Sequence, residues 1–329
     1  MTRQNGLFSI AEAAELITAG HFLTVAGDET ALRQLPPGHW LGGTIPYFMS
    51  PAGGITARDQ VYVHLIDCFA TPPRLSLRSA EQLPDLCREA PENGYSLIII
   101  PAFGECHRSF AENAPNYEDM YMKPLAGWIA GVHLDELGSR KPLVVLGETG
   151  EFAEDKVAVI DVELPAGRYA QVDIINPFRP GQLPAIRFAE AGFAAGTCEI
   201  GGKPGNLAEF LVANQVDTRL PLVADYCGAL VNVSIRSIDR ARGTVEFYAP
   251  VFPGLDYRIA EPLADYVSAF RNALPPPTTQ PDFACNCVLN YLYAELHGKQ
   301  AGHIGGPMTF GEIGYQLLNQ TMACLSVSP

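Results

Sequence analysis

The chain has 329 residues, with 36 acidic side chains and 22 lysines or arginines, so its formal net charge is −14. This excess of acidic residues argues against a nucleic-acid partner or an anionic membrane surface, because both bind through basic residues. A hydrophobic content of 47% excludes intrinsic disorder. The 31 glycines and 27 prolines indicate many turns and short elements, which argues against a helical bundle.

No apolar run approaches the roughly 18 residues of a membrane-spanning helix, and the first residues contain no apolar signal core. We therefore expect a cytoplasmic protein without a membrane partner. The eight cysteines are dispersed and include no C-x-x-C pair, so reduced thiols are expected throughout.

The N-terminal part predicts short alternating elements. Ser9 and Glu12 have the spacing of a capping box, so a helix is expected to begin there and to end at Gly20. Strands are predicted at residues 22–26, 40–48 and 61–67. A brief helix capped by Asp28 lies between the first two of these strands.

The middle of the chain predicts one long buried strand at residues 95–103, which contains three consecutive isoleucines. A helix is expected before it at residues 79–90, and a polar loop after it at residues 104–117. The further elements are strands at residues 142–147, 156–163 and 170–176 and a helix at residues 206–213.

The last third is predicted to begin with a hairpin of strands at residues 229–238 and 244–252, with Gly243 in the turn. A helix follows to residue 274, where three consecutive prolines end it. The remaining elements are a strand at residues 283–289, a short helix at 290–296, and strands at 308–313 and 321–327.

These elements predict an α/β (α+β) protein of two related lobes, each a mixed β-sheet covered by helices. We predict the boundary between the two lobes between residues 215 and 216, so the lobes comprise residues 1–215 and 216–329. Residues 40–48 and 303–310 both place two glycines before an apolar segment. This similarity suggests an internal duplication.

Three segments near the C-terminus carry a resemblance to a known family, namely Phe283-Ala-Cys-Asn-Cys-Val288, Gly306-Pro-Met-Thr-Phe-Gly-Glu-Ile-Gly314 and Asn319-Gln-Thr321. Together they resemble the C-terminal module of the FIST sensory-domain family. Residues 41–45, 128–131 and 203–207 resemble segments of its N-terminal module more loosely. The chain departs from the family pattern at Pro46-Tyr47 and after Cys287, and so looks like a divergent member.

The resemblance implies a non-enzymatic protein that senses a small ligand, such as an amino acid or its derivative. Family members usually carry an output module, and the two sensory modules would fill this chain. Signalling would therefore pass through a separate protein. Some members bind haem, so a haem-based gas sensor is an alternative, although the sequence itself names no cofactor.

Glu312 is the leading candidate for a ligand contact. A carboxylate between apolar strand residues is unfavourable to bury unless it meets a cation or hydrogen-bond donors. Its neighbour Gly311 allows close approach of a ligand, and Tyr315 follows in the same segment. The alternative is that Glu312 binds backbone N–H groups and Gly311 marks a bulge.

Cys285 and Asn286 form a second candidate contact, on opposite faces of the predicted strand. Cys285 and Cys287 are, however, more readily interpreted as small buried apolar residues. Glu105 and His107 form a third candidate, in the predicted loop after the buried strand, where ligands gather in α/β proteins. Cys106 lies between them and is expected to be the most reactive thiol. His64 is interpreted as a core histidine.

No P-loop, G-x-S-x-G or H-E-x-x-H motif occurs in the chain, which excludes P-loop nucleotide hydrolysis and removes the commonest hydrolase and metalloprotease patterns. The alternative to a sensor is an enzyme that acts on a small molecule through a cysteine or through a carboxylate such as Glu312.

Overall fold

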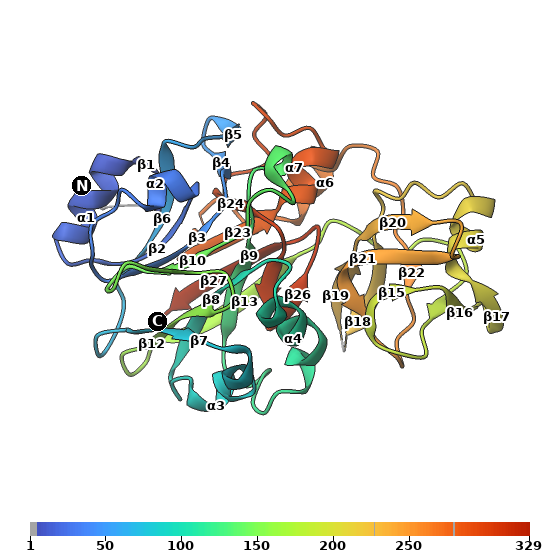
Figure 1. Ribbon diagram of the computed structural model, residues 1–329, viewed down its shortest axis with the longest axis horizontal. Coiled ribbons are helices and arrows are strands. Elements are labelled where there is room, and N and C mark those ends of the chain that lie inside the picture. Colours follow the sequence, from blue (N-terminus) through green and yellow to red (C-terminus); the bar gives the residue numbers. More distant parts are fainter. Residues whose placement is uncertain (1–4, 227, 279) are drawn as a thin grey trace.

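Three six-stranded mixed sheets form the larger part of the molecule, and three small sheets form a separate outer region (Figure 1). The computed structural model describes residues 5–226, 228–278 and 280–329. Mixed sheets that carry helices confirm the expected α+β class. Within the described residues, no helix is long and apolar enough to cross a membrane. The remaining N-terminal residues, on which the cytoplasmic prediction partly rests, lie outside the described residues.

The first sheet has the strand order β1-β6-β2-β3-β10-β11. Its strands are β1 (Gly6–Ser9), β2 (Phe22–Gly27), β3 (Trp40–Thr44), β6 (Gln60–Ile66), β10 (Val144–Leu146) and β11 (Glu151–Ala153). Helices α1 (Ile10–Thr18) and α2 (Glu29–Leu32) cover its outer face. The predicted capping box is present, because Ser9 and Glu12 bond each other's backbone N–H groups.

The second sheet has the order β7-β12-β8-β9-β25-β26. Its strands are β7 (Arg74–Arg78), β8 (Gly94–Pro101), β9 (Leu125–Ala130), β12 (Val157–Glu163), β25 (Glu312–Gly314) and β26 (Gln316–Leu318). Its helices are the 3-10 helices η1 (Ala80–Asp85), η2 (Ala114–Asn116) and η3 (Leu134–Glu136) with α3 (Leu86–Glu89) and α4 (Glu105–Asn113). The single helix predicted at residues 79–90 is divided into η1 and α3, and Pro84 lies within η1.

The third sheet has the order β13-β27-β23-β24-β4-β5. Its strands are β4 (Tyr47–Ser50), β5 (Gly53–Thr56), β13 (Tyr169–Ile175), β23 (Phe283–Cys287), β24 (Gly306–Thr309) and β27 (Met322–Ser328). Helices α6 (Tyr266–Ala273) and α7 (Val288–Tyr293) accompany it. Two predicted strands are divided between sheets, because residues 40–48 supply β3 and β4, and residues 308–313 supply parts of β24 and β25.

The three sheets share one connectivity. In each, an edge strand leads through a helix to a central strand, and a second helix leads to its parallel neighbour. The three parallel pairs are β2 with β3, β8 with β9, and β23 with β24. A hairpin follows, and the last strand returns antiparallel to the central strand. The body is thus built from three repeats, and the suggested duplication is one part of a triplication.

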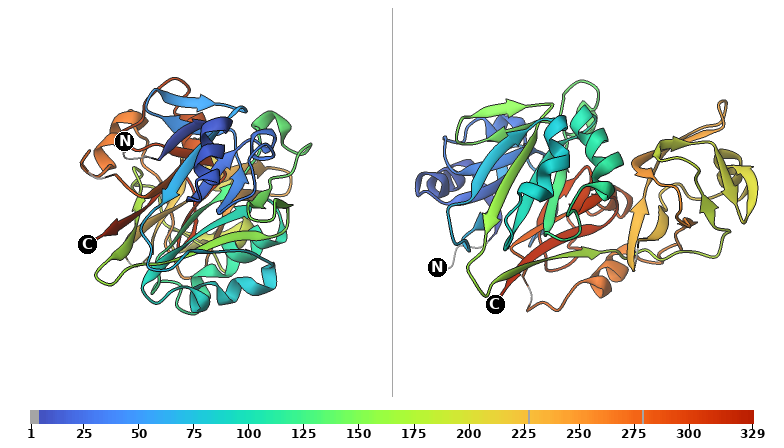
Figure 2. Two further views of the ribbon diagram at one scale, coloured as in Figure 1. Left: turned by 90° about the vertical axis from the view of Figure 1, so that its left-hand side faces the viewer. Right: turned by 90° about the horizontal axis from the view of Figure 1, so that it is seen from below.

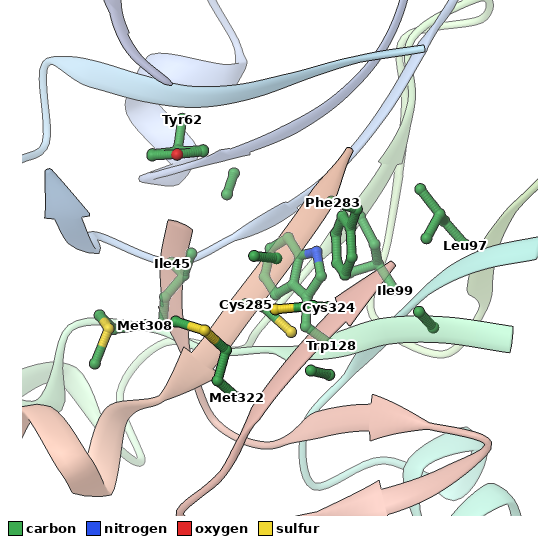
Figure 3. Packing of buried hydrophobic residues seen from close by; sticks show 14 of the residues in the cluster. Ile45, Tyr62, Leu97, Ile99, Trp128, Phe283, Cys285, Met308, Met322 and Cys324 are labelled. Atoms are coloured by element: carbon green, nitrogen blue, oxygen red, sulfur yellow. The ribbon is translucent and has the colours of Figure 1, made fainter. Parts of the chain in front are cut away.

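Each repeat gives its hairpin to a different sheet. Hairpin β4–β5 of the first repeat joins the third sheet, β10–β11 of the second joins the first, and β25–β26 of the third joins the second. The exchange is cyclic, so each sheet is completed by a neighbouring repeat. The inner faces of the three sheets share one apolar core, in which Trp128, Phe283 and Cys285 lie close together (Figure 3).

Residues 178–265 form the outer region, which is inserted between the first strand and the first helix of the third repeat. Its elements are β14 (Ile186–Arg187), β15 (Gly192–Ala195), β16 (Thr197–Ile200), β17 (Lys203–Asn206), α5 (Leu207–Ala213), β18 (Leu222–Tyr226), β19 (Ala229–Val233), β20 (Ile235–Asp239), β21 (Thr244–Val251) and β22 (Arg258–Ile259). It has an apolar core of its own. Figure 2 shows the C-terminus at the end of the body remote from this region.

The boundary predicted between residues 215 and 216 falls inside the outer region, between α5 and β18. Strands from both sides of it share the second and third sheets of the body. The natural division therefore separates residues 178–265 from a body formed by residues 5–177 and 266–329. Two features of this part of the chain are confirmed: the β20–β21 hairpin, and Gly243 in its turn with a φ of 65°.

A glycine in β9 controls how closely two parallel strands approach. A Cβ atom on Gly127 would lie 1.9 Å from the carbonyl oxygen of Ile98, a backbone atom that cannot move aside. We expect Gly127→Ala to reduce the free energy of unfolding by more than about 3 kcal/mol. The matched control is Gly104→Ala, whose Cβ would meet nothing closer than 3.4 Å. Equal urea midpoints for the two variants would contradict this assignment.

Candidate functional site

The third repeat contains a group of buried polar side chains where the outer region meets the body. Glu312 and Thr321 are 0% exposed, Asn290 is 1% exposed and Asn286 is 2% exposed. Asn286 is the penultimate residue of β23, Asn290 lies in α7, Glu312 begins β25 and Thr321 precedes β27. The four therefore come from different elements of one repeat, between β23 and β27, which the fold brings together.

Comparison of the three repeats shows that the fold does not require a carboxylate at position 312. Glu312 lies opposite Trp128, Val144 opposite Gly43, and Phe48 opposite Pro307. In each case the opposing residue directly follows a glycine of the third strand of a repeat, so the three positions are equivalent. Phe48 and Val144 are both 0% exposed and fill this position with apolar side chains.

Hydrogen bonds and burial determine the charge of Glu312. Its Oε2 accepts hydrogen bonds from the backbone N–H of Thr321 at 3.1 Å and from the Thr321 hydroxyl at 2.8 Å, whereas Oε1 has no partner. The thiol of Cys287 is also within hydrogen-bonding reach. Burial dominates these contacts and raises the pKa of Glu312 to about 8. The side chain is therefore mainly a neutral acid at pH 7, with Oε1 free to carry the proton.

Asn290 presents an unpaired acceptor whose orientation is fixed. The Oδ1 of Asn286 accepts the backbone N–H of Cys287 at 2.7 Å and the amide Nδ2 of Asn290 at 2.8 Å. The backbone donor fixes the orientation of Asn286, which in turn requires Asn290 to point its NH₂ group at Asn286. The Oδ1 of Asn290 is therefore the free atom, and it has no hydrogen-bond partner.

Asn290 opens onto a pocket of about 290 Å³ between the body and the outer region. Its lining consists of Phe178, Asp217, Arg219, Leu220, Leu263, Ala264, Asp265, Tyr266, Val267, Asn290, Tyr293, Ala294 and Gln320. The hydroxyl of Tyr266 is buried and makes no well-formed hydrogen bond, although Asn286 is near enough to influence its pKa. Two residues of the pocket wall, Asn290 and Tyr266, thus carry buried polar atoms without protein partners, at a site large enough for a small ligand.

A hydrogen-bond network fixes the outer region beside this pocket. Asn176 and Asn232 exchange side-chain hydrogen bonds of 2.8 and 3.0 Å. Gln320 accepts from the hydroxyl of Ser234 at 2.8 Å and donates to the carbonyl of Arg219 at 3.1 Å. Because Gln320 also lines the pocket, it connects the outer region directly to the candidate site.

A larger cavity, of about 630 Å³, lies on the other side of the junction, against β13 and β27. Its polar lining includes Asn176 and Arg179, which both make hydrogen bonds to the protein. Among the described residues, none of the buried polar atoms without partners lies in its wall. The smaller pocket is therefore the better candidate for recognition of a polar ligand.

The other residues near the C-terminus that were expected to contact a ligand are instead packed within the protein. Cys285 is buried in the central core, where its thiol donates to the carbonyl of Gly127 at 3.1 Å and burial raises its pKa. A Cβ on Gly311 would lie 2.8 Å from the side chain of Leu317, so this glycine allows close packing. Tyr315 occupies the turn between β25 and β26 with a φ of 64°, and packs against the core of the second sheet.

The expected loop at residues 104–117 is wrong, because residues 105–113 form α4. The buried side chains of Cys106, Phe110 and Ala111 share a helical face there, which the polar composition of the segment had obscured. Glu105 is the first residue of this helix. His107 accepts the backbone N–H of Phe103, packs against Phe193, and has its pKa lowered to about 4 by burial. Neither belongs to the polar group around Glu312.

His64 is a core histidine, as interpreted from the sequence. One ring nitrogen contacts the hydroxyl of Thr24 at 3.3 Å, and the other accepts the backbone N–H of Ala284 at 3.3 Å. Burial lowers the pKa of His64 to about 3, so the ring is neutral. Both nitrogens are engaged, which leaves none for a haem iron. Among the described residues, no group of three His, Cys, Asp or Glu side chains is placed to hold a metal ion.

The sequence interpretation identified Glu312 and Asn286 but missed Asn290, Tyr266 and Gln320. The available signal was a polar residue within an otherwise apolar segment, since Asn290 interrupts Val-Leu-Asn-Tyr-Leu and Gln320 lies in the Asn-Gln-Thr segment. Tyr266 gave no such signal, because its spacing on α6 is that of an ordinary core residue.

The chain belongs to a family of unknown function, DUF6976, whose model matches residues 8–328. The match includes the outer region as well as all three repeats of the body. No curated protein and no solved structure matches the chain.

The raised pKa of Glu312 predicts a specific dependence of stability on pH. Between the ordinary pKa near 4.3 and the folded value of about 8, the folded protein holds a proton that the unfolded chain has lost. The free energy of unfolding should therefore fall as pH rises, by about 1.4 kcal/mol for each pH unit within this interval. Glu312→Gln cannot titrate and should gain stability over the wild type as pH increases from 5 to 8.

Urea denaturation of both proteins at pH 5, 6.5 and 8 measures this difference. Asp161 and Asp282 also have pKa values raised by burial, but they are present in both proteins and cancel in the comparison. Parallel pH profiles for wild type and variant would show that Glu312 is ionised throughout.

The thiols provide an independent prediction. Seven cysteines are described as free, and Cys68 alone among them is not buried; the eighth, Cys227, lies outside the described residues. Cys106, expected from the sequence to react first, is buried, and its pKa is raised to about 11. In a Cys227→Ser background, brief iodoacetamide treatment should label Cys68 first and leave Cys285 and Cys287 unmodified, as read by peptide mass spectrometry. Early labelling of Cys285 or Cys287 would instead identify an activated thiolate.

Proposed function

We propose that the protein is a non-enzymatic small-molecule-binding protein whose ligand occupies the pocket between the third repeat and the outer region. The observation that carries this proposal is the free Oδ1 of Asn290. It is a buried acceptor with a fixed orientation and no protein partner, on a 1% exposed residue that lines the pocket. A ligand that donates to it would remove an unfavourable desolvation of roughly 1–3 kcal/mol.

The third repeat differs from the other two, and the places where it differs support this location for the ligand. The polar group around Glu312 and the insertion of residues 178–265 both occur in the third repeat, and the pocket lies where the two meet. The first and second repeats have apolar residues in place of Glu312. The departures from the repeated pattern therefore coincide with the pocket, as expected where one repeat has been adapted for binding.

The surroundings of the reactive groups favour binding over catalysis. Glu312 is 0% exposed and is not part of the pocket wall. The pKa values of Cys285 and Cys287 are both raised by burial, which disfavours a nucleophilic thiolate. Neither the carboxyl nor the thiols thus have the access and ionisation that a catalytic group needs.

A sensory role of the FIST type is the biological setting that we propose for this binding. It rests on the resemblance of residues 283–288 and 306–314 to that family's C-terminal module. In this setting the protein is cytoplasmic and transmits the state of its pocket to a separate signalling protein. The contacts of Gln320 with both the pocket and the outer region offer a path for such a signal.

Thermal-shift screening of a small-molecule library tests the proposed binding. Ligands of the pocket should raise the melting temperature of the wild type and of a Ser326→Ala control, which alters only the larger cavity. They should stabilise Asn290→Leu much less, since the loss of one buried hydrogen bond lowers affinity roughly tenfold. Compounds that stabilise all three proteins equally would place binding elsewhere. Chemical conversion of a hit, detected by mass spectrometry, would indicate an enzyme instead.

A further inference from the structure

We propose that the ligand of this pocket is a small organic cation that presents a primary ammonium group. This inference rests on the proposed binding function and specifies the chemistry of its ligand. Three features of the lining carry it: aromatic rings, an unpaired neutral acceptor, and an excess of carboxylates over basic groups.

Three of the residues that line the pocket are aromatic. Phe178, Tyr266 and Tyr293 all line it, and they come from three separate segments of the chain. The rings of Phe178 and Tyr266 have centroids 6.5 Å apart and are tilted by 45°. The face of an aromatic ring attracts a cation, and several rings around one site favour an organic ammonium group over a metal ion.

The free acceptor distinguishes a primary ammonium from a quaternary one. The Oδ1 of Asn290 needs an N–H or O–H donor, and the orientation of this amide excludes a donor role for that atom. A primary ammonium group supplies three N–H donors together with a positive charge. A quaternary group would occupy the aromatic walls but leave Oδ1 without a hydrogen bond.

The charges around the pocket favour a cation. Its ionisable lining comprises Asp217, Asp265 and one base, Arg219. Arg219 is engaged by Asp217, which accepts its Nη2 at 2.6 Å and its Nε at 3.0 Å, and this contact lowers the pKa of Asp217. Hydrogen bonds from Ser268 lower the pKa of Asp265, which stays ionised at neutral pH. Asp265 is therefore the carboxylate that has no basic partner within the lining, although Arg271, outside it, is near enough to lower its pKa further.

An anionic ligand is disfavoured by the same arrangement. It would have to compete with Asp217 for the guanidinium of Arg219 and would approach the charge of Asp265. The net charge of −14 on the whole chain opposes an anion further. The volume of about 290 Å³ restricts the cation to a small one, at the lower end of ligand pockets.

Titration with four simple probes, followed by NMR at constant ionic strength and pH 6.5, tests the inference. The probes are n-butylammonium, tetramethylammonium, n-butanol and butyrate. We expect n-butylammonium to bind at least tenfold more tightly than n-butanol, with tetramethylammonium intermediate and butyrate weakest. Equal binding of n-butylammonium and n-butanol, or stronger binding of butyrate, would overturn the inference.

Three variants, at two positions, locate the effect. Asp265→Asn keeps a residue that can cap α6 but removes the charge, and should weaken n-butylammonium roughly fivefold without changing the binding of n-butanol. Tyr293→Phe keeps the aromatic ring and should bind n-butylammonium as the wild type does, whereas Tyr293→Leu should bind it several-fold more weakly. Unchanged affinities in Asp265→Asn and Tyr293→Leu would show that the cation binds elsewhere.

The outcome separates this inference from the function on which it rests. If the four probes fail to bind but library compounds still require Asn290 for stabilisation, the pocket is a ligand site and the ammonium assignment is wrong. If no library compound depends on Asn290, the proposed binding function itself is wrong.

Discussion

The exchange of hairpins among the three repeats is the constraint on which the rest of the structure depends. The strand before each hairpin ends in one sheet, and the hairpin completes the next sheet. No sheet is complete without a strand pair from another repeat, so the three repeats are expected to fold together as one unit. The inner faces of the three sheets then close around a single apolar core, which contains residues from every repeat.

This repeated framework makes deviations from it informative. At the start of the exchanged hairpin, two repeats have a fully buried Phe48 or Val144, and the third has Glu312. A neutral apolar side chain is evidently compatible with the geometry of this position. A carboxyl there is less favourable for stability, because burial opposes its ionisation. This carboxyl occurs in the repeat that also supplies Asn290 to the pocket, which agrees with the binding function that we propose.

The neutral state of Glu312 also explains how the site is compatible with a stable core. A buried carboxylate without a cationic partner would be strongly destabilising, whereas a protonated carboxyl has hydrogen-bonding requirements similar to those of an amide. Thr321 supplies two donors to Oε2, and Cys287 lies beside the group. Of this polar group Asn290 lines the pocket, and it is the residue that we propose meets the ligand.

The local pattern of the sequence determined many of the helices, strands and turns of this protein, and also its fold class. The capping box at Ser9, the buried strand around residues 95–101, the β20–β21 hairpin and the α+β class all follow from short-range spacing of apolar, capping and turn residues. Even Glu312 could be singled out, because a charged residue between apolar strand positions requires an explanation. The helix at residues 105–113 was missed because its polar face outweighs its apolar one in the sequence.

Only the tertiary structure decided how these elements combine. The exchange of hairpins depends on the direction in which the chain leaves β3, β9 and β24, and no local pattern specifies that direction. The same limitation affected the domain boundary, since the insertion of residues 178–265 is recognisable only when strands on either side of it pair in one sheet. It also affected the pocket, where Phe178, Tyr266 and Asn290 meet although up to 112 residues separate them in sequence. Sequence spacing reports which residues share an element, whereas a binding site depends on which elements pack together.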